Sequence, residues 1–96
     1  MKDSAIAQIS LDTLSPGQRA YVCAVTAEGA VRRRLQEFGI TAGAPVKCVM
    51  RAPSGDPTAY QIRSAVIAIR REDARNVRIR FQEPEAGGTE VGADGG

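Results

Sequence analysis

The stretch from Ala30 to Phe38, Ala-Val-Arg-Arg-Arg-Leu-Gln-Glu-Phe, followed by Gly39, carries the clearest local signal in this 96-residue sequence. Its apolar residues Val31, Leu35 and Phe38 recur at the i, i+4 and i+7 spacing of one helical face. Glycine then stands where helices commonly end in a left-handed residue. This pattern predicts one amphipathic helix of about two and a half turns.

Short segments rich in β-forming residues surround this helix, and glycine and proline turns separate them. We expect five strands, at residues 19–25, 46–52, 58–63, 66–69 and 77–81, with a short helical turn at 71–76. So many short strands predict a mainly β fold, a small closed barrel rather than a flat sheet with exposed edges. Upstream, residues 9–14 hold three apolar side chains that could cover the core.

Charge is distributed unevenly along the chain. The formal charge is +2, but residues 83–96 contain Glu83, Glu85, Glu90 and Asp94 and no basic residue. Removing these four from the 11 acidic residues leaves 7 against 13 basic ones, or +6, on residues 1–82. We therefore expect one folded domain over residues 1–81 and a flexible, acidic, glycine-rich tail over residues 82–96.

The composition argues against catalysis and against a tight metal site. The sequence has no histidine, the commonest general base and imidazole ligand at neutral pH. Cys23 and Cys48 are far apart in sequence and lie in apolar runs, which favours buried thiols over a disulfide or a soft metal site. We expect no enzyme activity, no catalytic residue, no metal site and no cofactor.

No apolar run approaches the length of a membrane span, and the first residues do not form a signal peptide. We expect a cytoplasmic protein that does not insert into the membrane.

The order of several motifs resembles the ferrous iron transport protein A (FeoA) family. The resemblance spans Leu14 to Phe81 and rests on this series: Leu14-Ser-Pro-Gly17, Arg32-Arg-Arg-Leu35, Phe38-Gly39-Ile40, Gly43, Arg51-Ala-Pro53, Gly55-Asp-Pro57 and Arg70 to Ala74. Two positions depart from the family pattern. Phe38 replaces a leucine, and Ser64 replaces a glycine in the third hairpin, which puts the geometry of that turn in question.

The resemblance implies an SH3-like barrel and a function in bacterial ferrous iron uptake. The expected function is that of a non-enzymatic accessory protein, which docks on a membrane ferrous iron permease with a GTPase domain and modulates its assembly or activity. Whether iron, a transition metal ion, binds this chain directly stays open, as does weak self-association.

The candidate partner-binding residues lie on the basic helix, the turn after it and the proline-flanked loop. They are Arg32, Arg33, Leu35, Phe38, Ile40, Pro53, Asp56 and Pro57. The planar guanidinium group of arginine can donate two parallel hydrogen bonds to a carboxylate or a phosphate. A loop whose backbone is restricted by proline loses little conformational entropy on binding. The helix has the alternative of a solvated face with an Arg33–Glu37 pair. The loop has the alternative, favoured over docking, of a simple hairpin connection made of turn residues. Core packing is the safer assignment for Leu35. Helix capping and salt bridges are the simpler explanation for the acids Asp56, Glu72 and Asp73.

Two other functions remain as alternatives. A small basic barrel could bind nucleic acid, although only four aromatic residues are available for base stacking, so no nucleic acid partner is expected. The second alternative is a metal-responsive regulatory SH3-like module, the barrel found in metal-dependent repressors, here without a preceding DNA-binding domain.

Overall fold

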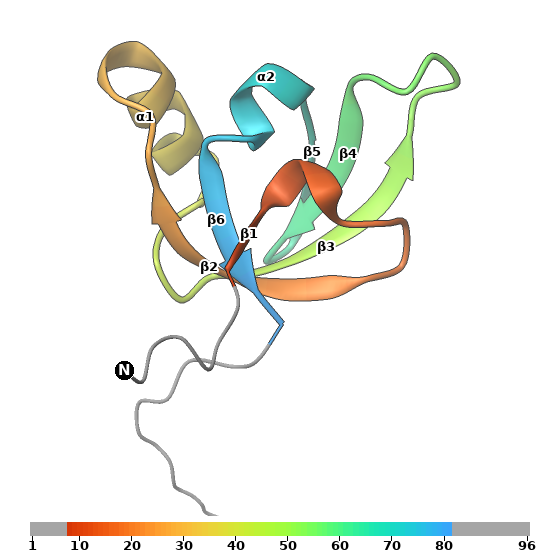
Figure 1. Cartoon of the computed structure of the whole chain (residues 1–96), viewed down its shortest axis with the longest axis horizontal. Coiled ribbons are helices and arrows are strands. Elements are labelled where there is room, and N and C mark those ends of the chain that lie inside the picture. Colours follow the sequence, from red (N-terminus) through yellow and green to blue (C-terminus); the bar gives the residue numbers. More distant parts are fainter. Residues whose placement is uncertain (1–7, 82–96) are drawn as a thin grey trace, which may run out of the picture.

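The computed structural model describes residues 8–81 as one strongly curved sheet with helices over one end (Figure 1). The strands are β1 (Ile9–Ser10), β2 (Arg19–Val25), β3 (Pro45–Arg51), β4 (Thr58–Ile62), β5 (Ala65–Ile69) and β6 (Val77–Arg80). The helices are the 3-10 turn η2 (Leu11–Thr13), α1 (Gly29–Glu37) and the short α2 (Arg71–Ala74). The strands pair antiparallel in the order β1-β6-β2-β3-β4-β5.

The mainly β class, the helix after the long first strand and the short helix before the last strand are confirmed, with differences in detail. The sheet has six strands instead of five, because β1 adds two residues that pair with β6. A two-residue strand is too short to show a sequence period. Phe81 is not part of the last strand, which ends at Arg80, and its side chain is 52% exposed.

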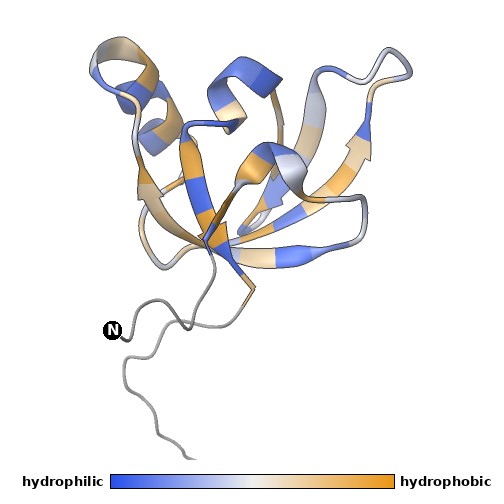
Figure 2. Cartoon of the chain, viewed as in Figure 1, coloured by the Kyte–Doolittle hydropathy of each residue, from blue (hydrophilic) through white to orange (hydrophobic). Residues whose placement is uncertain are grey.

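Alternation of apolar and polar residues separates the two faces of the sheet. Along β6, Val77 and Ile79 are fully buried while Arg78 points outward, a pattern visible as alternating colours in Figure 2. The core collects residues from every strand from β2 to β6, from α1, α2 and η2, and from the connecting segments. Its members are Leu11, Leu14, Ala20, Val22, Leu35, Ile40, Ala44, Val46, Cys48, Tyr60, Ile62, Ile69, Ala74, Val77 and Ile79.

The segment around η2 covers the core, as the sequence predicted for its apolar residues. Leu11 and Leu14 are both completely buried. Their backbone carbonyls accept hydrogen bonds from the sheet: Arg51 Nη2 donates to Leu14 O at 2.7 Å, and Tyr60 Oη donates to Leu11 O at 3.3 Å. Burial raises the pKa of the Tyr60 hydroxyl to about 12, so it stays a hydrogen-bond donor at neutral pH.

The end of α1 is fixed by a two-bond capping motif. The Ile40 N–H donates to Leu35 O at 3.0 Å, and the Gly39 N–H donates to Gln36 O at 2.9 Å. Gly39 has φ +97°, and a Cβ there would lie 3.3 Å from Ile62 Cγ2, so both conformation and space favour glycine. This arrangement is a Schellman motif, in which the residues corresponding to Leu35 and Ile40 commonly make an apolar contact.

The β4–β5 turn forms although Ser64 stands where the family pattern has glycine. The left-handed residue is Arg63, with φ +57°, and Ser64 does not have a positive φ. A left-handed conformation costs an L-residue roughly 1–2 kcal/mol. The hairpin therefore forms without a glycine, at the expense of local backbone strain at Arg63.

We predict that Arg63→Gly raises the free energy of unfolding by up to about 1 kcal/mol, because relief of strain exceeds the extra entropy of glycine in the unfolded chain. Chemical denaturation measures this change. Arg63→Gln is the matched control, since it removes the same charge but keeps the strain. Equal effects of the two variants would contradict the explanation by backbone strain.

Candidate functional site

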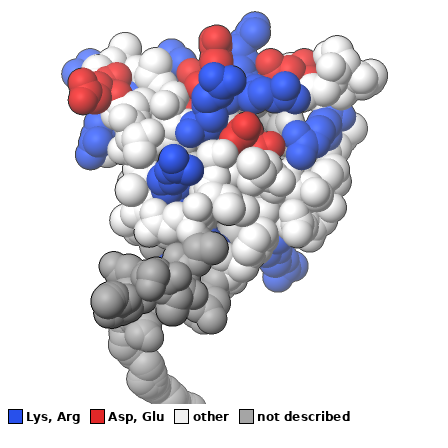
Figure 3. Space-filling view, in the orientation of Figure 1, with Lys and Arg blue, Asp and Glu red and all other residues white. Residues whose placement is uncertain are grey.

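Three segments line one end of the molecule: α1, α2 and the loop at residues 52–57. Figure 1 shows α2 between the other two. Cationic and anionic side chains gather over this end in the face seen in Figure 3. All eight residues predicted to bind a partner belong to α1, to the turn after it or to this loop.

The arginines of α1 fall into two groups. Arg32 and Arg33 are exposed, and Arg32 Nη1 donates to Val25 O at 3.3 Å, across to the end of β2. The Arg33–Glu37 pair considered from the spacing is not formed. Arg34 instead makes the one ion pair within residues 8–81, with Asp73 of α2, at 3.1 Å. Arg32 and Arg33 therefore keep their charges available on the surface.

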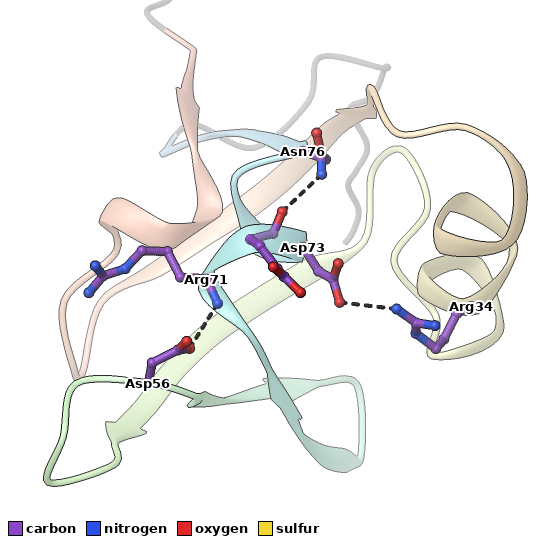
Figure 4. A network of polar contacts seen from close by, with 6 residues as sticks. Arg34, Asp56, Arg71, Asp73 and Asn76 are labelled. Carbon is purple, nitrogen blue, oxygen red and sulfur yellow. Dashed lines mark hydrogen bonds and ion pairs between the residues drawn. The ribbon is translucent and has the colours of Figure 1, made fainter.

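The Arg34–Asp73 pair joins the two helices (Figure 4). Arg34 Nη2 donates to Asp73 Oδ2, with the side chains 49% and 16% exposed. Pairs this accessible to water contribute up to about 1 kcal/mol each. The contact is therefore a minor contribution to stability that links α1 to α2.

Asp56 connects the loop at residues 52–57 to α2. Its Oδ1 accepts a hydrogen bond from the Arg71 backbone N–H at 2.8 Å (Figure 4). The first N–H groups of a helix have no intrahelical partner, so this carboxylate acts as a cap from another part of the chain. Helix capping by Asp56 and salt bridging by Asp73 are thus confirmed as structural roles.

A shallow groove of about 310 Å³ runs between α1 and the strand–helix junction before α2. Arg34 and Phe38 line one wall, and Arg70 and Glu72 line the other. Phe38 is half-buried, so part of its ring is available at the groove. The groove combines an apolar surface with charges of both signs.

Two of the residues predicted to bind a partner are buried, so the prediction is wrong for them. Leu35 is 1% exposed and Ile40 is 0% exposed, so neither offers a partner any surface. The Schellman turn at Gly39 is the reason, because it directs both side chains into the core. Pro53 and Pro57 are exposed, but the loop that carries them lies on the other side of α2 from α1 (Figure 1).

The two cysteines do not form a site together. The Cys48 N–H donates to Gln18 O at 3.0 Å, just before β2. Gln18 precedes Cys23 by five residues, or about 17 Å at 3.3–3.4 Å per extended residue. Both are free thiols. Burial raises the pKa of each, opposed by Arg80 near Cys23 and by Arg51 near Cys48. Both thiols are therefore protonated at neutral pH, a poor state for binding metal.

Within residues 8–81, no three His, Cys, Asp or Glu side chains are grouped in a way that could hold a metal ion. In the same range, no helix has the length and apolar character needed to span a membrane.

The FeoA domain family model matches residues 9–81, which is most of the chain. The chain belongs to the FeoA family. A FeoA/FeoB fusion protein of Porphyromonas gingivalis, named as Fe(2+) transport protein A joined to the Fe(2+) transporter FeoB, is 32% identical over 71 residues. That match covers 74% of this chain and 8% of the fusion protein, so this chain spans only a small part of its relative.

Solved FeoA structures share the fold. The FeoA protein of Chlorobium tepidum is 35% identical, with a TM-score of 0.73 over 82% of this chain and 75% of the other. The FeoA of Stenotrophomonas maltophilia, solved with zinc and described as a prokaryotic SH3-domain protein, is 31% identical, with a TM-score of 0.67 over 74% of this chain and 88% of the other. The strongly curved sheet described above is therefore the SH3-like fold that the family resemblance implied. Within residues 8–81 hydrogen bonds do not close it, because β1 and β5 are edge strands.

We predict that Asp56→Ala lowers the free energy of unfolding by about 1 kcal/mol, because the Arg71 N–H loses its acceptor. Asp56→Asn is the control, since its side-chain oxygen can still accept this hydrogen bond. Thermal or urea denaturation compares the variants. A loss in Asp56→Asn as large as that in Asp56→Ala would show that charge, not the hydrogen bond, matters here.

We predict that Leu35→Ala costs about 2–4 kcal/mol of unfolding free energy, because a fully buried side chain leaves a cavity. Gln36→Ala, on the exposed face of the same helix, should change stability by less than about 0.5 kcal/mol. Urea denaturation measures both. A loss below about 1 kcal/mol for Leu35→Ala would return this residue to the candidate docking surface.

Proposed function

We propose that this chain is a non-enzymatic accessory protein of a bacterial ferrous iron uptake system. It docks through the α1–α2 end on the cytoplasmic GTPase region of a membrane ferrous iron permease and modulates the assembly or activity of that permease. Ferrous iron is the cargo of the permease, and the proposal asks no iron chemistry of this chain.

The observation that carries the proposal is the fused relative. In the Porphyromonas gingivalis protein, a domain similar to this chain and a Fe(2+) transporter share one polypeptide. Domains that are fused in one organism and separate in another commonly act on each other. Association with the permease is the simplest function that accounts for this fusion.

The surface of the α1–α2 end supports docking on an acidic protein patch. Arg32 and Arg33 extend from α1 without an ion-pair partner within residues 8–81. Guanidinium groups of this kind suit bidentate recognition of carboxylates. The partly exposed ring of Phe38 and the groove beside it supply apolar contact next to these charges.

The loop at residues 52–57 is the second contact in this proposal. Backbone hydrogen bonds hold it, from the Ala52 N–H to Pro57 O at 2.9 Å and from the Gly55 N–H to Ala52 O at 2.7 Å. Asp56 ties the same loop to α2. A loop already ordered before binding loses little entropy when Pro53 and Pro57 meet a partner.

We predict that the double variant Arg32→Glu/Arg33→Glu weakens binding to the GTPase region about tenfold or more, because charge reversal opposes a complementary acidic patch. Its fold should be intact, since both side chains are exposed. Isothermal titration with the purified GTPase region measures the affinity, and an NMR titration maps the contact.

The matched control reverses two exposed arginines on the sheet, Arg19→Glu/Arg78→Glu, and should leave the affinity within about twofold. Unchanged binding by the helix variant, or an equal loss in the control, would overturn the docking surface. Ferrous ion and an oligonucleotide are titrated in parallel. NMR shifts with either ligand and none with the GTPase region would favour the metal-responsive or the nucleic acid-binding alternative.

A further inference from the structure

The charges of residues 8–81 are segregated between the helical end and the outer face of the sheet. All six acidic residues of this range lie outside the strands β2 to β6: Asp12, Glu28, Glu37, Asp56, Glu72 and Asp73. In the face seen in Figure 3, the acidic groups gather at the upper end, over the helices. The sheet and its β4–β5 turn carry only cations, so its outer face has a positive potential with no local compensation.

Two of these cations are held directly opposite each other. Arg19 of β2 and Lys47 of β3 are register partners, and Lys47 in turn faces Gln61 of β4. Like charges at opposed strand positions destabilise a sheet. Neither cation has an ion-pair partner within residues 8–81. An anionic group between them would convert this repulsion into attraction.

A groove of about 200 Å³ lies over this row. Arg19, Lys47 and Arg63 surround it, and Tyr21, Pro45 and Gln61 complete its lining. Arg63 reaches it from the strained β4–β5 turn, where its backbone has φ +57°. The groove thus offers three cationic groups, one phenol and one amide, and no acid, a composition suited to a carboxylate-rich segment.

The sequence contains such a segment directly after the last strand. Residues 82–96 include Glu83, Glu85, Glu90 and Asp94 and no basic residue. The strand β6 ends at Arg80, which pairs with Tyr21 at the groove. Strands are spaced by about 4.8 Å, so the groove from β2 to β4 lies within roughly 15 Å of that point. A segment of this length spans up to about 50 Å when extended.

We propose that the groove formed by Arg19, Lys47 and Arg63 binds the acidic segment of this same chain, residues 82–96. The carboxylates of the segment neutralise the opposed cations and cover the outer face of the sheet. Because the segment is tethered, its effective concentration at the groove is on the order of millimolar, enough to occupy a weak site. The consequence is that other polyanions are kept off this face, and the α1–α2 end remains the accessible charged surface.

A nucleic acid is the competing occupant, and the groove fits it less well. Tyr21 is the one aromatic residue in its lining. Sequence-tolerant binding of single strands relies on successive aromatic platforms, each contributing about 1–3 kcal/mol. A carboxylate segment needs only the cations that are present.

The test uses the full chain with its four late acids neutralised, Glu83→Gln, Glu85→Gln, Glu90→Gln and Asp94→Asn. We expect amide NMR shifts in residues 19–21, 46–47 and 61–63 relative to the unmodified chain, and the same shifts in the unmodified chain on raising the salt. In the background Arg19→Gln/Lys47→Gln/Arg63→Gln, neutralising the acids should produce no such shifts. In the control background Arg33→Gln/Arg75→Gln, the shifts should persist.

Two results would overturn the proposal. One is a set of amide shifts confined to residues after Arg80, and the other is a set of shifts on α1 and α2.

A fluorescent oligonucleotide distinguishes the two occupants. Its affinity should rise about two- to tenfold when the late acids are neutralised, because the tethered competitor is lost. Equal affinity for both chains, with binding abolished by Arg19→Gln/Lys47→Gln/Arg63→Gln, would assign the face to nucleic acid and overturn the proposal. Neither outcome depends on binding to the permease, so the docking function can fail or hold independently.

Discussion

Because Gly39 turns the chain back at the end of α1, Leu35 and Ile40 enter the core together while the arginines of the same helix stay outside. One left-handed residue thereby sets the helix against the sheet, closes the core at that side and decides which side chains a partner can reach. The Arg34–Asp73 pair and the Asp56 cap refine the position of α2 within this arrangement. They are weaker interactions that act on a geometry already fixed by apolar packing.

The same arrangement gives the molecule two charged regions of different character. At the helical end, acids and bases alternate, and some are paired, so recognition there depends on where individual charges lie. The outer sheet face carries cations alone, so its attraction for anions is long-ranged and unselective. A protein that must find one partner benefits when the unselective face is covered and the selective one is exposed.

Much of this structure follows from local pattern. The apolar spacing predicted α1 to within one residue at each end, and β-forming residues between glycine and proline turns located the five longer strands. Sequence patterns missed two details. The strand β1 has only two residues, too few to show the alternation of a strand. The alternation of apolar residues continues to Phe81, although the pairing of β6 with β2 ends at Arg80. The number of short strands predicted a small barrel, and the family resemblance added that the barrel is SH3-like.

The candidate site was less predictable, because its contacts join residues distant in sequence. Arg34 and Asp73 are 39 positions apart, and Asp56 caps a helix that begins 15 residues later. No spacing rule links such pairs. The spacing of the basic helix located the exposed arginines Arg32 and Arg33, but the burial of Ile40 depends on the Schellman turn, whose hydrogen bonds are not visible in the sequence. The strained Arg63 was likewise hidden, since glycine was expected one residue later.

The pairing of β1 with β6 has a consequence for how such a domain can be used in evolution. Ile9 lies opposite Ile79, so the two ends of the described chain emerge side by side, away from α1 and α2 (Figure 1). Neighbouring termini make a domain portable, because it can be appended to or inserted into another polypeptide without distorting its core. Here the attachment points are also remote from the helical end. In a fusion of the kind seen in the Porphyromonas gingivalis relative, such a domain can be joined to another polypeptide at these ends while its helical end stays exposed.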